Sequence, residues 1–412
     1  MSKTNYSFWL SIFLCLVNSF AISAAEDNII NFAIQAHSIK QEQTFRNKLR
    51  EFESQNPTIK VRVRKLSSAS FPILKKNLLS MIDDVDVINW FSGKRLNALV
   101  DDGLIVNINE FWSAHRLSDK YASATKEQVF YQGNSYALPL TSYIWGFLYK
   151  KSLFERLELN QPATWQEFLK VLEVLDNNQI APIGLGTKLS WQSASWFDYL
   201  MLRLHGKDKY QQLVHGDLPY TSNEVKLVFH YWKTLLDKQY FFAQHKFFDG
   251  GELMPLLFRE VIGLNLIGSF AVRDLPLNHQ QEIGFFAFPS MNNVKDNSAL
   301  VPMSVLSITQ KGSKNVSVNK LLEFFSLPSN QSSFNNQLNT ISPLATITPH
   351  SSELLIQTNQ ALVEASFLSQ YYDREVTFEM GEFAKKAFAD FISHKNIEKV
   401  TQALEQKRKE YN

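Results

Sequence analysis

The chain is 412 residues long, with 45% hydrophobic and 20% charged residues and a formal net charge of +2. This length exceeds what one hydrophobic core usually serves, so two lobes are expected. The nearly neutral charge gives no support to nucleic-acid binding or to strong attraction to an anionic membrane.

The first 25 residues have the pattern of a secretory signal peptide. Lys3 supplies a weak positive start, residues 8–22 are mostly apolar, and residues 23–25 are small. The apolar run is too short and too interrupted for a membrane span, which needs about 20 apolar residues. Cys15, the only cysteine, lies in the middle of this run, where lipid attachment is not expected. We therefore expect a periplasmic protein whose mature chain has no thiol and depends on packed cores for its stability.

Strand and helix patterns alternate in the first part of the mature chain. Residues 29–36 have an apolar strand pattern, and apolar residues then recur at helical spacing until the Asn-Pro pair at 56–57. Residues 59–64 alternate apolar and basic side chains, as in a strand with one wet face. A helix over 71–82 and a strand over 86–90 come next. This order predicts an α/β lobe around a mostly parallel sheet.

The pattern breaks at residues 130–142. Residues 131–135 predict a hairpin turn, and residues 136–140 predict an extended crossing into a second lobe. There, Thr164 and Glu167 match a capping box, with Thr at the helix cap and Glu three residues later. The helix that follows has a good apolar stripe.

The later segments complete the second lobe and return to the first. The remaining expected elements are a buried strand over 262–269, a short helix around 272, an extended crossing over 283–289, a strand over 301–309, and helices over 318–326, 353–370 and 378–410.

Residues 182–204 place Trp191 and Trp196 just after a glycine-broken loop. Indole rings cover a large apolar area at little conformational cost, and the C–H face of a sugar matches a flat, partly polar ring. The pattern therefore predicts an aromatic surface for a ligand. Burial in the core is the alternative for both rings, above all for Trp196, which begins the apolar stripe of a helix.

Catalytic and metal-binding motifs are missing from the sequence. It has no phosphate-cradling loop, nucleophile elbow or His-Glu-x-x-His helix. His205 and His215 are ten residues apart, which matches no common ligand spacing. The acidic pairs at 83–84 and 101–102 are typical of solvated turns, although a glycoside hydrolase would need two carboxylates. We therefore expect no metal and no cofactor, and binding is favoured over catalysis.

Several short motifs occur in a fixed order along the chain, at residues 52–61, 86–90, 104–108, 136–139, 148–154, 162–168, 263–270, 283–289 and 370–374. Their order resembles that of the extracellular solute-binding proteins of carbohydrate ABC transporters. Each motif is weak alone, whereas their order and spacing over residues 29–410 are specific.

The resemblance implies an α/β, two-lobed periplasmic-binding-protein fold of type II, in which each lobe is a mostly parallel sheet flanked by helices. Residues 26–139 and 289–327 would form the N-terminal lobe, and residues 140–288 and 328–412 the C-terminal lobe. The chain would cross between the lobes at these three boundaries, and the lobes would close over one ligand by a hinge.

The resemblance also implies where a ligand would stack. Trp90 would sit where the first lobe meets the cleft, with a core position at the end of a strand as an equally good interpretation. Tyr143 and Trp145 follow the first crossing, at a position that faces ligand in the family. Trp191 and Trp196 occupy the region that resembles the family's sugar-stacking segment.

Polar candidates surround these rings. Lys188 and Asp198 are candidate partners for hydroxyl groups, although a solvated or helix-terminal role suits Asp198 equally well. Ser269 is a further candidate. Beside it, Phe270 replaces a Trp that is common in the family, which weakens this wall of the site and removes an N–H donor.

The segment Tyr372, Asp373 and Arg374 resembles a loop on the ligand side of the family's cleft. An ion pair between the lobes, from Asp to Arg, is the alternative interpretation of the two charged residues.

Together, these patterns predict a monomeric periplasmic protein that binds a mono- or oligosaccharide and delivers it to the permease subunits of an ABC importer, without catalysis. Three alternatives remain open: a secreted glycoside-active enzyme, a subunit that presents bound sugar to a membrane receptor, and a binder of polyamines or amino acids. The aromatic candidates have few acidic residues among them, which argues against a cleft for cations. The identity and length of the sugar do not follow from the sequence.

Overall fold

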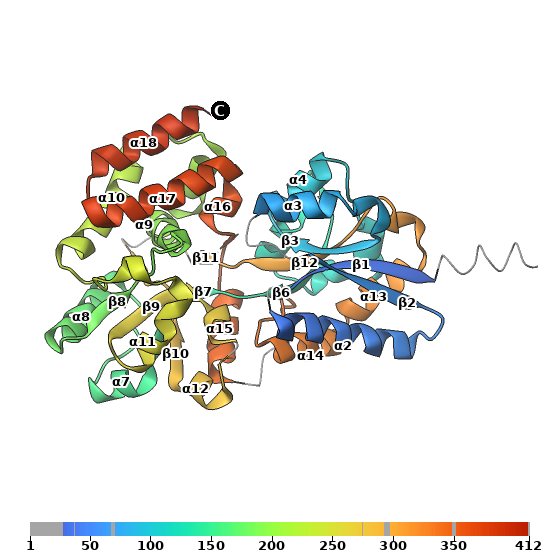
Figure 1. Cartoon of the computed structure of the whole chain (residues 1–412), viewed down its shortest axis with the longest axis horizontal. Helices are drawn as coiled ribbons and strands as arrows, with labels where there is room; N and C mark the ends of the chain where they lie inside the picture. Colours follow the sequence, from blue (N-terminus) through green and yellow to red (C-terminus); the bar gives the residue numbers. More distant parts are fainter. Residues whose placement is uncertain are drawn as a thin grey trace, which may run out of the picture.

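The protein folds into two lobes that lie side by side along its longest axis (Figure 1). This computed structural model describes residues 28–36, 38–66, 71–273, 275–291, 297–347 and 352–410. The predicted signal peptide lies outside the described residues. Within the described residues, no helix has the length and apolar character that a membrane crossing requires.

The first lobe is built on a five-stranded sheet with the order β2-β1-β3-β12-β6. Its strands are β1 (Ile29–Gln35), β2 (Lys60–Leu66), β3 (Val87–Phe91), β6 (Leu138–Ser142) and β12 (Met303–Ile308). β1 is parallel to β2 and β3, whereas β12 is antiparallel to both β3 and β6. The sheet is therefore parallel except for β12, a late strand inserted in the reverse direction.

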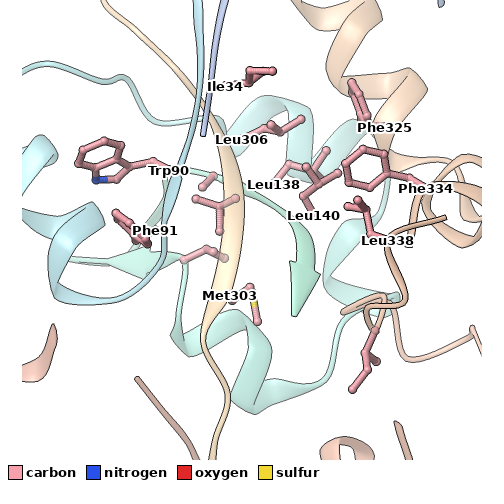
Figure 2. Packing of buried hydrophobic residues seen from close by; sticks show 14 of the residues in the cluster. Ile34, Trp90, Phe91, Leu138, Leu140, Met303, Leu306, Phe325, Phe334 and Leu338 are labelled. Carbon is pink, nitrogen blue, oxygen red and sulfur yellow. The ribbon is translucent and has the colours of Figure 1, made fainter. Parts of the chain in front are cut away.

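Helices from distant parts of the chain pack against one another in the first lobe. α2 (Ile39–Gln55) contacts α14 (Pro328–Leu338), which also contacts β6. Figure 2 shows Phe334 of α14 close to Leu140 of β6. We predicted that the chain leaves this lobe after residue 327, and this prediction is wrong because α14 packs Phe334 and Leu338 into the first core.

The second lobe contains a four-stranded sheet with the order β10-β7-β9-β8. Its strands are β7 (Trp145–Lys150), β8 (Ala181–Gly184), β9 (Ile262–Gly268) and β10 (Ile283–Phe286). β8 is parallel to β9, and β7 is antiparallel to both β9 and β10. Three strands therefore run in one direction with β7 reversed between them, which repeats the plan of the first sheet.

The predicted capping box is present at α8 (Trp165–Asn177). The Glu167 N–H donates to Thr164 Oγ1 at 3.3 Å, and the Thr164 N–H donates to Glu167 Oε2 at 3.0 Å. The other α-helices are α3 (Phe71–Leu79), α4 (Lys94–Asp101), α5 (Asn109–Ala114), α6 (Ser123–Glu127), α7 (Lys151–Arg156), α9 (Trp191–His215), α10 (Asn223–Asp237), α11 (Met254–Phe258), α12 (Leu277–Glu282), α13 (Ser317–Ser326), α15 (Glu353–Val363), α16 (Tyr372–Glu375), α17 (Phe378–His394) and α18 (Ile397–Lys409).

Three connections join the lobes. The first runs from β6 to β7, and the second runs from β10 to β12 and contains β11 (Ala299–Leu300). The third runs from α14 to α15, which packs against β10. Two segments that we predicted as extended crossings, 136–140 and 283–289, instead contribute β6 and β10, so the lobes are linked at the ends of sheet strands.

The helix predicted over 353–370 ends early, at Val363. The chain then forms β13 (Leu368–Ser369), which is parallel to β11 in the second connection. Pairing with a strand that is distant in sequence therefore overrides the local helical pattern, and it brings the segment that follows, from Gln370 on, to the junction of the lobes.

Gly146 of β7 has no room for a side chain. A Cβ there would lie 2.4 Å from the Phe285 ring and 2.7 Å from the Phe286 carbonyl oxygen of β10. Because the backbone of a paired strand yields little, we expect Gly146→Ala to lower the free energy of unfolding by about 1–3 kcal/mol. Urea unfolding measures this change. Gly251→Ala is the control, since nothing lies within 4 Å of a Cβ there, and equal losses in the two variants would contradict the prediction.

Candidate functional site

Five aromatic side chains meet where the first connection enters β7. Trp145 is buried and lies at the centre of this aromatic cluster. Its ring makes edge-to-face contacts with Trp191, Phe270 and Tyr371, with centroids 5.7, 6.1 and 5.3 Å away. Tyr143 contacts Phe270 in the same way at 5.2 Å. The four outer rings are only partly buried, so Trp145 forms a floor beneath rings that retain exposed surface.

Hydrogen bonds fix the Trp145 side chain and its strand. The indole N–H donates to the Tyr371 hydroxyl at 3.1 Å, and the Trp145 carbonyl accepts from the Tyr199 hydroxyl at 2.6 Å. On β9, Gly268 is the partner of Trp145. A Cβ on Gly268 would lie 2.8 Å from the indole nitrogen and 2.5 Å from the Phe270 ring. Glycine at this position therefore allows the two rings to approach each other.

The loop that presents Trp191 is held from beneath by Gln192. The Gln192 Nε2 donates to Asn265 Oδ1 at 2.6 Å and to the Leu266 carbonyl at 2.9 Å. Its Oε1 accepts from the Gly186 N–H at 2.7 Å. These bonds join the glycine-containing loop and the first turn of α9 to β9, and they hold Trp191 at the start of the helix with its ring partly exposed.

Buried polar atoms that have no hydrogen-bond partner among the described residues include Ser269 Oγ, Gln35 Nε2 and Gln370 Oε1 near the lobe junction. Gln35 is the last residue of β1, and Ser269 directly follows β9. The orientation of the Gln370 amide is set by its Nε2, which donates to Ser92 Oγ at 2.8 Å and to Gln128 Oε1 at 3.1 Å. An unpaired buried polar group costs about 1–3 kcal/mol, so these atoms are suited to a ligand or to ordered water.

Arg374 links the two lobes by stacking. Its guanidinium carbon lies 4.4 Å from the ring centroid of Tyr371 and 4.6 Å from that of Phe91 in the first lobe. Arg95 continues the series, at 4.9 Å from Phe91 and 3.8 Å from Phe71. Cations at such distances over aromatic faces are attracted by the ring quadrupole. We call these five residues the stacking ladder; it extends from the aromatic cluster into the first lobe.

The charges beside the stacking ladder are partly removed from water. Burial lowers the pKa of Arg95 to about 9, and the nearby Arg374 charge lowers it too, whereas Asp373 acts to raise it. One Asp373 oxygen lies 3.9 Å from Arg95 and 3.6 Å from Lys385. An ion pair between the lobes, which was the alternative interpretation for Asp373, is therefore present, with Arg95 as its partner. A cavity of about 190 Å³ opens beside it, lined by Trp90 of β3 and by residues of α3, α4, α16 and the start of α17.

Four of the predicted ligand residues are buried and lie beneath the site. Trp196 is fully enclosed in the second core, because five residues of helix turn it by about 140° from Trp191. Trp90 is also buried and donates its indole N–H to a backbone carbonyl of α4 at 3.1 Å. Asp198 and Tyr372 are fully buried and bonded to each other through the Tyr372 N–H at 3.1 Å. These four side chains are therefore buried in this structure, and their contact with a ligand stays a prediction.

Other residues complete the comparison between sequence and site. Lys188 is exposed and pairs with Glu252 at 3.2 Å, which places it at the rim. Sequence reasoning missed Tyr371, Phe91 and Gln35. Tyr371 and Phe91 are each next to a predicted site residue, and Gln35 lies near the end of a predicted strand. Cleft residues gather at the ends of strands, and this rule was the signal that could have found them.

The described residues hold no group of three or more His, Cys, Asp or Glu side chains that is arranged to bind a metal ion. Two α/β lobes joined by three connections, with partly exposed rings and unpaired polar atoms at their junction, define a binding protein for a small ligand. The chain belongs to the bacterial extracellular solute-binding protein family, which matches residues 36–332.

Curated relatives match about half of the chain. A multiple sugar-binding protein of Streptococcus mutans serotype c is 24% identical over 220 residues, which cover 52% of this chain and 51% of the relative. An uncharacterized ABC transporter extracellular-binding protein of Pyrococcus horikoshii is 27% identical over 192 residues, which cover 45% of this chain and 44% of the relative. The chain thus spans about half the length of the curated relatives it matches.

Solved structures share the fold over nearly the whole chain. The bacterial solute receptor AcbH, described as having an exclusive substrate preference for β-D-galactopyranose, has a TM-score of 0.83 at 20% identity, covering 93% of this chain and 99% of AcbH. RafE in complex with raffinose has a TM-score of 0.73 at 16% identity, covering 92% and 98%. The predicted two-lobed α/β fold is confirmed.

The buried Asp198 carboxyl makes stability depend on pH. Burial raises its pKa well above the usual range, although hydrogen bonds from the Tyr372 N–H and the Tyr210 hydroxyl act to lower it. Above the ordinary carboxyl pKa of about 3.9, the folded protein therefore holds this proton more tightly than the unfolded chain does. This contribution favours folding at low pH and is lost as pH rises toward the raised pKa of the folded state.

We expect Asp198→Asn to remove this dependence. The amide oxygen can accept from the Tyr372 N–H, and the Tyr210 hydroxyl, which donates to Asp198 Oδ1, can rotate to accept from the amide NH₂. The melting temperature of the variant should exceed that of the wild type by a few degrees at about pH 8, and the difference should shrink toward about pH 4. A variant that is less stable at both pH values would contradict the prediction.

Proposed function

We propose that this protein is the periplasmic sugar-binding subunit of an ABC importer. The observation that carries the proposal is the aromatic cluster, in which the partly exposed rings of Trp191, Phe270 and Tyr371 rest on the buried Trp145 indole. Flat rings match the C–H face of a pyranose, and polar atoms near them match its hydroxyl groups. The solute-binding family, a relative named for multiple sugars, and structural neighbours named for galactopyranose and raffinose support the same function.

The hydroxyl partners in this proposal are the buried polar atoms that have no partner within the described structure. Ser269 and Gln370 supply oxygen atoms, and Gln35 supplies an N–H donor. Trp191 and Phe270 supply the main stacking faces. Phe270 offers a smaller ring than a tryptophan and no N–H, so it orients a sugar by its face alone.

Capture follows from closure of the lobes around the ligand. Closure removes hydroxyl groups from water, and each must find a partner because an unpaired buried polar group costs about 1–3 kcal/mol. This requirement selects sugars by stereochemistry. Micromolar affinity needs about 8 kcal/mol, which several stacked rings and hydrogen bonds can supply. In this proposal the protein acts as a monomer, releases its ligand unchanged, and presents the closed form to the permease.

A thermal-shift screen of the secreted protein tests the function. The panel contains D-galactose, raffinose, stachyose and chitin oligosaccharides, with putrescine and amino acids as competing classes. We expect at least one sugar to raise the melting temperature, since a ligand at 100 times its Kd stabilises the folded state by about 2.7 kcal/mol. If only a polyamine or an amino acid does so, the proposal fails. Chromatography of the incubated sugars should show no products, which separates binding from hydrolysis.

Trp191→Ala should weaken binding of the sugar that the screen identifies. Loss of a stacking ring at the centre of a site costs about 2 kcal/mol or more, which is roughly a 30-fold rise in Kd. Isothermal titration calorimetry measures this value. Phe247→Ala is the control, because Phe247 is an exposed aromatic residue, 76% accessible, outside the cluster. Equal affinities of the Trp191 and Phe247 variants would exclude stacking on Trp191.

The stacking ladder should contribute to affinity through lobe closure. Arg374→Ala removes the cation between Tyr371 and Phe91, and a desolvated contact of this kind contributes about 1–2 kcal/mol. We expect Kd to rise about 5- to 30-fold by calorimetry. Phe91→Leu should cause a similar loss, and the double variant should lose less than the sum because both changes break the same contact. The control is Arg156→Ala, at an exposed arginine of the second lobe, which should bind like the wild type. Additive losses in the Arg374 and Phe91 double variant would contradict the shared contact.

A further inference from the structure

Asp249 lies beside Trp191 and is the N-cap of a short helix, where its side chain forms a capping box with Glu252. It precedes a one-turn 3-10 helix, Gly250–Leu253, and its Oδ1 accepts from the Gly250 N–H at 2.7 Å. Its carboxylate also accepts a hydrogen bond from the Trp191 side chain, whose only donor is the indole N–H. The carboxylate is thus attached to the ring that carries most of the proposed stacking.

The backbone next to Asp249 supports the same ring. A Cβ on Gly250 would lie 2.9 Å from the Trp191 Cη2 atom and 2.7 Å from Gln192 Oε1. The indole therefore rests against the Gly250 backbone, and Gln192 anchors that region to β9. Asp249 holds one edge of the indole while Gly250 contacts another, so together they define the tilt of the ring.

The Asp249 carboxylate retains capacity to accept hydrogen bonds. It is half-buried, and no ion pair within 4 Å joins it to any cation of the described chain. The nearest candidate, Lys188, pairs instead with Glu252 at 3.2 Å. A carboxylate has about four acceptor positions, and the structure fills three of them, with the Gly250 N–H, the Glu252 N–H and the Trp191 side chain. A partly dehydrated carboxylate without a cation is best matched by neutral hydroxyl donors, to which it forms strong, charge-assisted bonds.

We propose that Asp249 positions Trp191 and also accepts a hydrogen bond from a hydroxyl at the edge of the sugar ring stacked on that indole. The proposal rests on the sugar-binding function above. It makes Asp249 a specificity-determining residue, since a sugar that lacks this hydroxyl, or carries it on the opposite face, leaves the carboxylate without its donor.

Calorimetry with D-galactose and raffinose, and with the monodeoxy forms of galactose, tests the proposal. Asp249→Ala should raise Kd about 10- to 100-fold, as expected for a hydrogen bond to a charged group, and Asp249→Asn, which keeps one acceptor, should cause a smaller rise. One deoxy sugar should bind the wild type weakly and should lose little further affinity in Asp249→Ala. A residue that only maintained the fold would weaken all the sugars equally, and that result would overturn the hydroxyl contact.

The positioning role has its own measurement. Trp191→Phe identifies the near-ultraviolet circular dichroism band of the Trp191 indole, because this variant lacks the band. In the absence of ligand, that band should shift in Asp249→Ala. An unchanged band would overturn the positioning of Trp191 by Asp249. Glu252→Gln is the control, because Glu252 lies in the same turn and its Oε2 accepts from the Asp249 N–H at 2.7 Å, a bond that glutamine preserves. It should bind within about twofold of the wild type. If the wild type binds no sugar, the proposed function fails; if it binds sugar and Asp249→Ala binds equally well, only this inference fails.

Discussion

The position of the Trp145 indole is the constraint on which the site depends. Rings from three separate segments, Trp191, Phe270 and Tyr371, pack edge-on against it. The outer rings also remain partly exposed, as stacking on a ligand requires. Because Trp145 directly follows the first connection between the lobes, the aromatic surface and the hinge share one piece of backbone. Motion of the hinge and geometry of the site are therefore linked.

Further contacts between the lobes lie outside the aromatic cluster. Arg374 stacks on a ring from each lobe, and Gln370 donates to Ser92 across the junction. The depressed pKa of Arg95 reports how far this region is removed from water. In the binding cycle proposed above, separation of the lobes returns these groups to water, and the hydration that they regain offsets part of the lost contacts. A ligand that adds a few kcal/mol to closure would then determine which state is populated.

Local patterns in the sequence predicted most elements but not which lobe they join. The capping box at Thr164 and the alternating strands are local features, and they appear where expected. α14 has no apolar stripe that could predict its place, because its buried residues include Asn330, Gln331 and Asn335 besides Phe334 and Leu338. The burial of Trp196 also could not be predicted from local sequence alone. Helical spacing from Trp191 explains this burial, but only once the start of α9 at Trp191 is known. Tyr371 reaches the site because β13 pairs with β11, a long-range contact without a local sequence signal.

The division between paired and unpaired polar groups indicates what kind of ligand suits the site. The Tyr371 hydroxyl accepts from the Trp145 indole and donates to the Tyr143 hydroxyl, so Tyr371 offers a ligand its ring face. The unpaired atoms, in contrast, include both a donor, on Gln35, and an acceptor, on Gln370. A cation satisfies only acceptors, and an anion satisfies only donors. A hydroxyl group satisfies either, so a neutral ligand with several hydroxyls, as in the proposed function, can pair both kinds of buried group.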